Sequence, residues 1–337
     1  MSAPLLDVED LRVGFTVKGA TGSRRTLRLT AVDGVSLSVD RRETLGLVGE
    51  SGCGKSTFAN ALVRLVPFEG RVRLDGEDVT HLRGRRLVEY RRRVQLVFQD
   101  PYASLNPRLS VRRLIAEPIA FARRASGGAA GRDEIDHRVT ELLGLVGLSA
   151  DAADRYPHEF SGGQRQRIGL ARALSVEPSV ILADEPVSAL DVSIQAQIIN
   201  LLIDLQNRLD LTLVFIAHDL AVVRHVSDRV GVMYLGRVVE LAPADDIYAR
   251  PLHPYTVALL AAIPVPDPEV QANRKRIVLG GDAPSPMSVP SGCRFHPRCP
   301  IARAEPCSTL DPPLVEVEAG RFVACHFPGE LDLPDAL

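Results

Sequence analysis

The sequence has no tryptophan, and aromatic residues make up only 5% of its 337 residues. It also has almost no excess of one charge, because 40 Lys and Arg residues stand against 42 Asp and Glu residues, for a formal net charge of −2. This balance argues against a protein dedicated to nucleic-acid binding. Long apolar runs are missing too, since Ser179–Ala183 and Val257–Val265 are far shorter than the roughly 20 residues of a membrane span.

The overall composition is typical of a globular, water-soluble protein, with 45% hydrophobic and 24% charged residues. Its length predicts one large α/β domain with a smaller appendage. Residues 1–7 show no basic segment followed by an apolar one, so we expect no signal peptide. If such a protein works at a membrane, it must dock onto other chains there.

A glycine-rich segment gives the first functional signal. Residues 49–57 fit the phosphate-loop pattern G-x-x-x-x-G-K-[ST], between a predicted buried strand, Glu43–Val48, and a predicted helix, Phe58–Leu65. Backbone N–H groups, the helix N-terminus and the charge of Lys55 would bind phosphate, and Ser56 would place its hydroxyl on Mg²⁺. The predicted nucleotide-binding residues are Gly49, Ser51, Gly52, Cys53, Gly54, Lys55, Ser56 and Thr57.

Two acids follow an apolar strand later in the chain. The strand Ser179–Ala183 ends in Asp184 and Glu185, and an acid in this place beside a phosphate loop is typical of nucleotide hydrolases. We expect Asp184 to hold Mg²⁺ through water and Glu185 to polarise the attacking water. The alternative is a strand-end turn with two solvated acids.

A third motif, Phe160–Arg167, places two glycines after a serine at a predicted helix start near Gln164, which suits an anion. With it, residues 5 to 250 resemble the ABC ATPase family, although Phe160 stands where the family usually has leucine. The signature residues are Ser161, Gly162, Gly163 and Gln164. Three further family motifs occur in order, namely the Q-loop at Gln99, the D-loop at Ser188–Asp191 and the switch histidine at His218.

The resemblance implies an ABC-type nucleotide-binding domain in residues 1–250, with a RecA-like parallel sheet core, an antiparallel β subdomain and a helical subdomain at about 100–165. It implies catalytic roles for Glu185, His218 and Gln99, and Mg²⁺ binding by Ser56, Gln99 and Asp184. Phe15 would stack on adenine, the alternative being an ordinary half-buried strand residue. ATP would lie between two subunits, so that Ser161 acts on the partner's nucleotide.

The pattern of the residues agrees with this fold. Alternating polar and apolar positions in residues 5–50 predict antiparallel strands, with a loop at Gly19–Arg25. Later, apolar strands at 179–183 and 212–217 flank a predicted helix at 192–209, and such alternation predicts a parallel sheet. Residues 100–165 read as helical around a loop at 126–131. The six arginines between Arg83 and Arg93 favour a solvated helix face, the alternative being contact with acidic lipid head groups or a membrane partner.

The end of the chain gathers four of the five cysteines, spaced C-x5-C-x7-C-x17-C. In a reducing compartment such clustering favours a metal over disulfides, although paired C-x2-C knuckles are lacking. Four thiolates are the ligands of an iron–sulfur cluster, with His296 and His326 as alternative ligands and free cysteines as the alternative reading. The candidate ligands are Cys293, Cys299, Cys307 and Cys325.

This tail also resembles a subfamily, the ATP-binding subunits of oligopeptide and dipeptide importers. The resemblance rests on Arg250–Thr256 and Gly292–Pro300, and on Pro101–Arg108 and Asp191–Asn200. It implies a C-terminal extension at 251–337, a [4Fe-4S] cluster on the cysteines, and peptide import powered by ATP and Mg²⁺. The implied partners are a second, different ATPase subunit, two transmembrane permease subunits at the cytoplasmic face of the membrane and, indirectly, an extracellular peptide-binding protein.

Other functions remain open. The ATPase could import another small solute, such as a metal or a sugar-like ligand. ABC ATPases that act on DNA or ribosomes usually carry a coiled-coil insertion or two nucleotide domains, and this sequence has neither, so we expect no nucleic-acid partner. A redox sensor with a vestigial ATPase disagrees with the intact Lys55, Asp184, Glu185 and His218.

Overall fold

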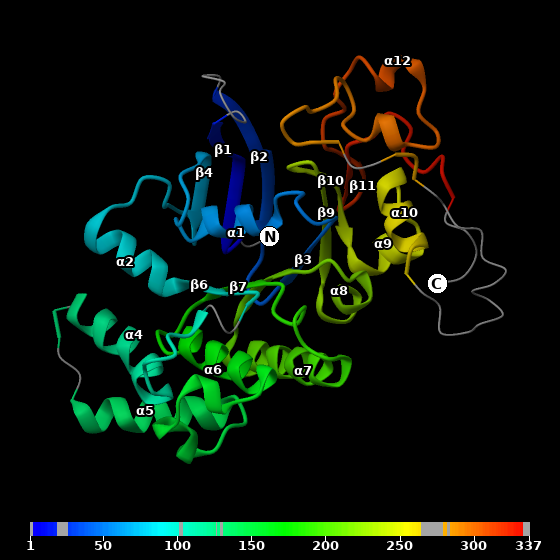
Figure 1. Cartoon of the computed structure of the whole chain (residues 1–337). Coiled ribbons are helices and arrows are strands. Elements are labelled where there is room, and N and C mark those ends of the chain that lie inside the picture. The colour runs from blue at the N-terminus through cyan, green and yellow to red at the C-terminus, as the bar shows by residue number, and fades with distance from the viewer. Residues whose placement is uncertain are drawn as a thin grey trace. The chain divides into compact units, whose positions relative to one another are not determined.

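The structure is a computed structural model of residues 1–337, and it describes residues 3–18, 26–100, 104–125, 127–128, 131–263, 279–281 and 284–332 (Figure 1). The chain divides into two compact units that are each discontinuous in sequence. The first comprises residues 1–6, 39–43 and 72–216, and the second comprises residues 7–38, 44–71 and 217–337.

The core of the first unit is a parallel arrangement of three strands, β6 (Val94–Val97), β7 (Val180–Asp184) and β8 (Thr212–Ile216). β7 pairs with β6 on one side and β8 on the other. Every residue of β7 and β8 is buried, as expected for strands covered on both faces. Helix α7 (Val192–Leu209) connects β7 to β8 at the bounds that the sequence predicts. The predicted parallel sheet is therefore confirmed.

Helices make up much of the rest of this unit. They are α2 (Gly84–Arg93), α4 (Val111–Ala125), α5 (Arg132–Leu145) and α6 (Gly162–Leu174), with 3-10 turns η1 (Ala150–Asp154) and η2 (Pro157–Glu159). α4 packs on α5 and α6 (Figure 1). Residues three to four positions apart bury one face of each helix: Val111, Leu114 and Ile115 on α4, and Val139, Leu142 and Leu143 on α5.

The arginine-rich segment forms α2, beside the short antiparallel pair β4 (Glu69–Leu74) and β5 (Glu77–Asp78). Its Arg86 and Arg93 form ion pairs with Glu77 and Asp75, on the exposed side of the helix. These pairs agree with the reading of the segment as a solvated helix face.

The second unit holds a mixed sheet. β3 (Thr44–Val48) runs parallel to β9 (Arg229–Tyr234), and β9 is antiparallel to β10 (Arg237–Pro243). β10 then pairs with β12 (Arg321–Val323), which pairs with β11 (Val315–Glu318). The last strands of the chain thus extend the same sheet that carries β3.

Two long strands form a second sheet in this unit. β1 (Leu6–Lys18) and β2 (Thr26–Val39) are hydrogen-bonded neighbours, as the alternating pattern predicts. The predicted loop Gly19–Arg25 between them lies outside the described residues. The helices of the unit are α1 (Lys55–Leu62), α8 (Leu220–Val226), α9 (Ala244–Ala249), α10 (Pro254–Ala261) and α12 (Ala304–Cys307), with the 3-10 turn η3 (His296–Arg298).

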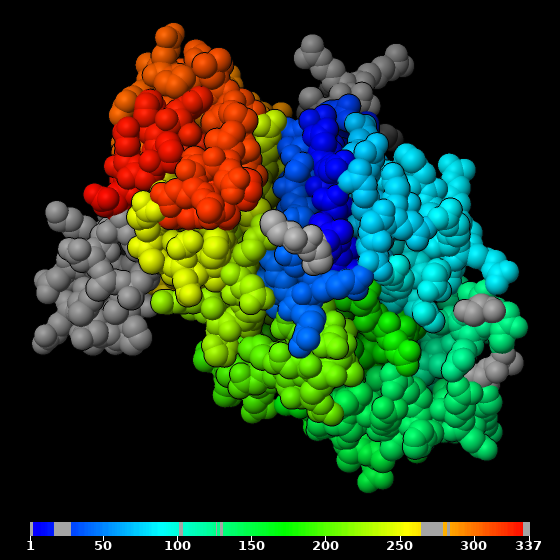
Figure 2. All heavy atoms as spheres, turned by 180° about the vertical axis from the view of Figure 1, so that it is seen from behind, coloured from blue at the N-terminus to red at the C-terminus, as the bar shows by residue number. Residues whose placement is uncertain are grey.

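The C-terminal segment 284–332 packs against residues of the same unit. Figure 2 shows its orange and red atoms in contact with the yellow atoms of residues 240–260. Phe295 is buried there with Tyr255, at 1% and 0% exposure. Within the described ranges, none of the helices combines the length and apolarity needed to cross a lipid bilayer.

Candidate nucleotide site

The phosphate-loop segment forms the turn from β3 into α1, as the sequence predicts. Two of its glycines lie in the left-handed region, with φ of 152° at Gly49 and 110° at Gly54. A Cβ atom at Gly49 would come within 2.2 Å of the Met233 carbonyl oxygen, and one at Gly54 within 2.2 Å of the Ala31 carbonyl oxygen. The loop therefore needs glycine at both ends, for its backbone angles and for close packing.

Lys55 folds back over this loop. Its Nζ donates hydrogen bonds to the carbonyl oxygens of Gly49 at 2.6 Å and Glu50 at 3.2 Å, and the residue is only 4% exposed. Ser51 and Gly52 are exposed, whereas Cys53 is buried. The arrangement puts a cation, a helix N-terminus and loop N–H groups in one place, which is the chemistry that binds a polyphosphate.

The strand-end acids lie in the first unit. Asp184 is the last residue of β7 and is 7% exposed, and Glu185 follows it with a left-handed φ of 45°. Glu185 Oε2 accepts a hydrogen bond from Gln99 Nε2 at 2.7 Å. The parallel pairing of β6 with β7 explains this contact, because it places Val97 opposite Ala183. Gln99 and Glu185 each follow two residues later, just past the ends of these strands. Such an amide and carboxylate can orient a water molecule.

The signature segment begins helix α6. Ser161 is its N-cap: the hydroxyl accepts from the Gln164 N–H at 3.3 Å, and the Ser161 N–H donates to Gln164 Oε1 at 3.0 Å. Both residues are exposed, so this helix N-terminus is accessible. Gly163 faces α7, where a Cβ atom would come within 2.4 Å of Ile194 Cγ2. The helix starts at Gly162, two residues earlier than predicted.

The remaining predicted residues are more scattered. Asp191 caps α7 from an extended conformation, and Ser188 Oγ donates to the Glu185 carbonyl at 3.1 Å. His218 is exposed, two residues after β8, and Phe15 is half-buried on β1. Phe15, Lys55 and His218 belong to the second unit, whereas Gln99, Asp184 and Glu185 belong to the first. Of the segment Pro101–Arg108, residues 101–103 lie outside the described residues.

The four C-terminal cysteines are all free thiols. The Cys293 N–H donates to the Cys307 carbonyl at 2.8 Å, which holds two of them in one turn region. Burial raises the pKa of Cys299 to about 11 and that of Cys325 to about 12, with smaller contributions from the neighbouring cysteines. Among the residues that the structure describes, no three His, Cys, Asp or Glu side chains are arranged to hold a metal ion. The side chains as placed do not fit the predicted iron–sulfur site.

Sequence reasoning missed several residues that hold the phosphate loop. Glu50 contacts Arg298 and Tyr255, and Gly236 donates its N–H to the Cys53 carbonyl at 2.8 Å. Tyr255 and Arg298 occur in the very segments that indicate the importer subfamily, which is the one signal that could have pointed to them.

Comparison with known proteins agrees with this geometry. Residues 32–188 match the family described as ABC transporter, and residues 239–307 match the family described as oligopeptide/dipeptide transporter, C-terminal region. The oligopeptide transport ATP-binding protein AppF of Bacillus subtilis (strain 168) is 50% identical over 324 residues, 96% of this chain and 97% of that protein. The oligopeptide transport ATP-binding protein OppF of Salmonella typhimurium (strain LT2) is 50% identical over 326 residues, 95% of each.

The fold is also similar to solved structures. A dimeric, post-hydrolysis state of an ATP-binding cassette bound to ADP and Pi has a TM-score of 0.62 and 29% sequence identity, and the match covers 71% of this chain and 98% of that one. The residues that match the ABC transporter family, 32–188, thus include both the phosphate loop and the strand-end acids.

Proposed function

The chain belongs to the ABC transporter family, in its oligopeptide and dipeptide branch, and from this premise we propose that it is the ATP-hydrolysing subunit that powers import of peptides through a membrane transporter. The observation that carries the proposal is the combination of a buried, loop-bonded Lys55 with a C-terminal region of the peptide-transporter type. We divide the chain into an ATPase domain at residues 1–250, with its helical part at about 100–165, and an extension at 251–337.

For nucleotide binding we propose that the loop N–H groups and Lys55 hold the ATP phosphates. Phe15, a half-buried residue of β1, packs on adenine. Ser56, Gln99 and Asp184 are the proposed Mg²⁺ ligands, directly or through water. When bound, Mg²⁺ neutralises part of the charge that develops on the phosphates.

For hydrolysis we propose that Glu185 accepts a hydrogen bond from the attacking water and orients it toward the terminal phosphate. Gln99 fixes the carboxylate through its bond to Oε2. His218 acts on the same reaction from the exposed end of β8. Catalysis of this kind depends on positioning and on electrostatic stabilisation more than on covalent chemistry.

We propose that the ATP-bound state is a pair of ATPase subunits. The exposed N-terminus of α6, with Ser161 and the two glycines, would bind the nucleotide of the partner subunit, and Asp191 would lie at the same interface. ATP then stabilises the closed pair because it contacts both subunits only in that state. The full assembly would contain a second, different ATPase subunit and two permease subunits, at the cytoplasmic face of the membrane, with an extracellular peptide-binding protein.

The cysteine segment enters this proposal only as a candidate cluster site. Four thiols in one segment are the ligand set of a [4Fe-4S] cluster. We assign them no step in transport, because no three side chains of the described residues are arranged to hold a metal ion. Iron and acid-labile sulfide in anaerobically purified protein test this part on its own. Four moles of each per chain would support a cluster, and none would remove it.

Peptide uptake by intact cells tests the function. Cells that lack this chain should fail to take up a labelled peptide that the wild type imports, and the full chain should restore uptake. The Glu185→Gln chain, expressed to the same level, should not. Unchanged peptide uptake in the deletion strain, together with lost uptake of a metal or a sugar, would replace the peptide assignment.

A further inference from the structure

The second residue of the phosphate loop is held by the C-terminal part of the chain. Arg298 Nη1 and Nη2 donate to the two carboxylate oxygens of Glu50 at 2.8 Å and 3.0 Å, a two-pronged pair across 248 residues of sequence. The backbone N–H of Glu50 donates to the Tyr255 hydroxyl at 2.9 Å. The Arg298 side chain is 9% exposed and that of Glu50 is 32% exposed, so solvent screens this pair less than an ordinary surface ion pair.

Arg298 and Tyr255 are themselves fixed by aromatic packing. The rings of Tyr234, Tyr255 and Phe295 form a cluster with centroid distances of 4.6 Å, 5.3 Å and 5.4 Å. The Arg298 N–H donates to the Phe295 carbonyl at 3.0 Å, and its guanidinium lies 6.0 Å from the Tyr234 ring centroid. The guanidinium that pairs with Glu50 is therefore held in place by packing against a buried aromatic cluster.

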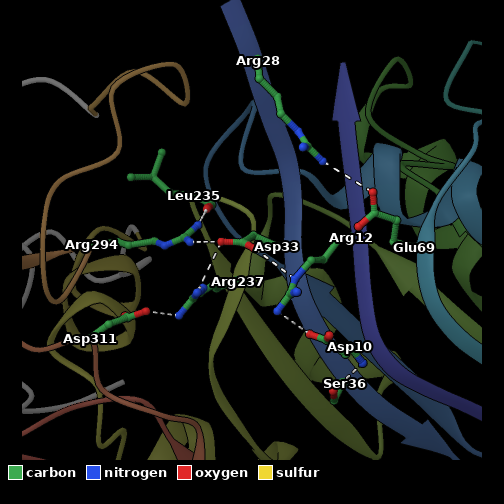
Figure 3. Close-up of polar contacts among 10 residues, drawn as sticks. All are labelled: Asp10, Arg12, Arg28, Asp33, Ser36, Glu69, Leu235, Arg237, Arg294 and Asp311. Atoms are coloured by element: carbon green, nitrogen blue, oxygen red, sulfur yellow. Dashed lines mark hydrogen bonds and ion pairs between the residues drawn. The ribbon is translucent and has the colours of Figure 1, made fainter. Parts of the chain in front are cut away.

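A second arginine from the same turn contacts residues next to the loop. Arg294 donates to the Leu235 carbonyl and pairs with Asp33, which also pairs with Arg237 and Arg12 (Figure 3). Leu235 precedes Gly236, whose N–H donates to the Cys53 carbonyl of the phosphate loop at 2.8 Å. Arg298 thus contacts the loop directly at Glu50, and Arg294 is linked to it through Leu235, Gly236 and Cys53.

The pairing of Glu50 with Arg298 matters for nucleotide binding because Glu50 carries a negative charge. An unpaired carboxylate within a phosphate-binding loop repels the phosphates that the loop must bind. Glu50 also supplies one of the carbonyl oxygens that accept from Lys55 Nζ, so a shift of Glu50 would move the lysine as well. Pairing with Arg298 cancels the repulsion and fixes the backbone from which the following N–H groups project.

We propose that Arg298 and Tyr255 are positioning residues for ATP binding, which act by neutralising and fixing Glu50 at the start of the phosphate loop. The cysteine-bearing turn is then part of the nucleotide site and not only an appendage. The proposal rests on nucleotide binding by this loop, a property of the family, and it is independent of the solute that is transported.

The test measures nucleotide affinity of the full-length chain by titration calorimetry with Mg·ATP, Mg·ADP and AMP. Arg298→Met should weaken Mg·ATP roughly tenfold, a loss of about 1.4 kcal/mol. The loss should decrease from ATP to ADP to AMP, because the repulsion scales with phosphate charge. Glu50→Gln combined with Arg298→Met should recover most of the affinity for Mg·ATP. Arg298→Lys should have an affinity between those of the wild type and Arg298→Met. A general folding defect would instead weaken all nucleotides alike, without recovery in the double variant.

Arg303→Met is the matched control, because Arg303 lies in the same segment but pairs with the exposed Glu330. It should bind all three nucleotides like the wild type. Tyr255→Phe keeps the ring and removes only the hydroxyl, so it tests the proposal even if Arg298→Met does not fold. It should weaken Mg·ATP by a few-fold at nearly unchanged melting temperature. Wild-type affinity for Mg·ATP in both Arg298→Met and Tyr255→Phe would overturn the proposal, and so would equal losses of affinity for ATP and AMP. Failed peptide uptake alone would contradict the proposed transport function and leave this proposal unchanged.

Discussion

Gln99 and Glu185 are joined by a hydrogen bond of 2.7 Å from Nε2 to Oε2, although they come from different strand ends. Glu185 holds this position with a φ of 45°, which is unusual for a residue with a side chain. Its own N–H donates to the Ile216 carbonyl at 2.9 Å, so the backbone is fixed from the far side by β8. A carboxylate held by two neighbouring strands is well suited to orient a water molecule, and its contact with Gln99 gives a path by which movement of the Gln99 segment changes hydrolysis.

Replacing the carboxylate should separate binding from chemistry. Glu185→Gln keeps the size of the side chain and a partner for Gln99, but removes the charge that polarises water. We expect ATP affinity within about twofold of the wild type and turnover lower by roughly 10² or more. Single-turnover hydrolysis in the assembled complex measures this, and near wild-type turnover would contradict the assignment.

Removing Gln99, the partner of Glu185, should lower turnover less than the loss of Glu185 does, and only when Glu185 is intact. Gln99→Ala leaves the carboxylate intact but unoriented, so we expect roughly a tenfold loss of turnover. In the Glu185→Gln background the same change should have little further effect, because the two side chains act together. A double-mutant cycle of turnover numbers measures the coupling, and full additivity would show that the contact has no role in hydrolysis.

The local elements could be predicted from sequence, whereas contacts set by topology could not. Helix α7 matches its predicted bounds because its apolar period is a local signal. Helix α1 begins at Lys55 and ends at Leu62, three residues earlier at each end than predicted, since the loop glycine leads directly into the first turn and Arg64 turns left-handed with a φ of 62°. The pair Gln99–Glu185 depends on the register of β6 with β7, which no single segment encodes.

The contact of Glu50 with Arg298 is a second contact that could not be predicted from sequence. Glu50 occupies a position that the phosphate-loop pattern leaves free, and its partner is 248 residues away. The predicted cysteine cluster is not supported by the described residues, and it stays a proposal. Spacing along the chain brings four thiols into one segment, and Cys325, whose pKa is raised by burial, lies near enough to the other three for their charges to raise it further. In the part of the chain that the structure describes, no three of these side chains are arranged to hold a metal ion.

Close packing of the signature helix gives a pair of matched glycine substitutions. At Gly163 a Cβ atom would come within 2.4 Å of Ile194 Cγ2, while at Gly169, in the same helix, nothing lies within 4 Å. Gly163→Ala should therefore lower the free energy of unfolding by about 1–3 kcal/mol. Gly169→Ala should raise it by about 0.5–1 kcal/mol, because alanine favours the helix. Urea denaturation measures both, and equal effects of the two changes would contradict the packing at Gly163.

The exposed helix N-terminus at Ser161 should act on the partner's nucleotide. Ser161→Arg places a bulky cation at this helix N-terminus and leaves the residues of the chain's own phosphate loop unchanged. We expect nucleotide affinity of the isolated chain within about twofold of the wild type, and loss of the ATP-dependent subunit pair. Light scattering of the hydrolysis-deficient Glu185→Gln chain, with and without Ser161→Arg, measures pairing. Unchanged ATP-dependent pairing would disprove the shared site.

A buried histidine predicts a pH dependence of stability. His253 caps α10 with Nδ1, which accepts from the Tyr255 N–H at 3.0 Å, and burial lowers its pKa from 6.5 to about 3. The folded protein therefore binds fewer protons than the unfolded chain between these values, so stability is lost as pH falls below 6.5. Relative to His253→Asn, which keeps a capping acceptor, the wild type should lose about 2 kcal/mol between pH 7 and pH 5. Urea denaturation of both proteins at each pH measures the difference, and a constant difference would show that folding does not lower the pKa of His253.

Peptide-dependent ATP hydrolysis tests the central claim most directly. The chain should be purified with its membrane subunits and its partner ATPase, reconstituted into lipid vesicles, and supplied with the external binding protein and ATP. We predict that a bound peptide raises ATP hydrolysis several-fold and drives peptide accumulation in the vesicles, and that Glu185→Gln in this chain abolishes accumulation. ATP hydrolysis and peptide accumulation that are unaffected by Glu185→Gln, or hydrolysis that responds to another solute and never to peptides, would contradict the account.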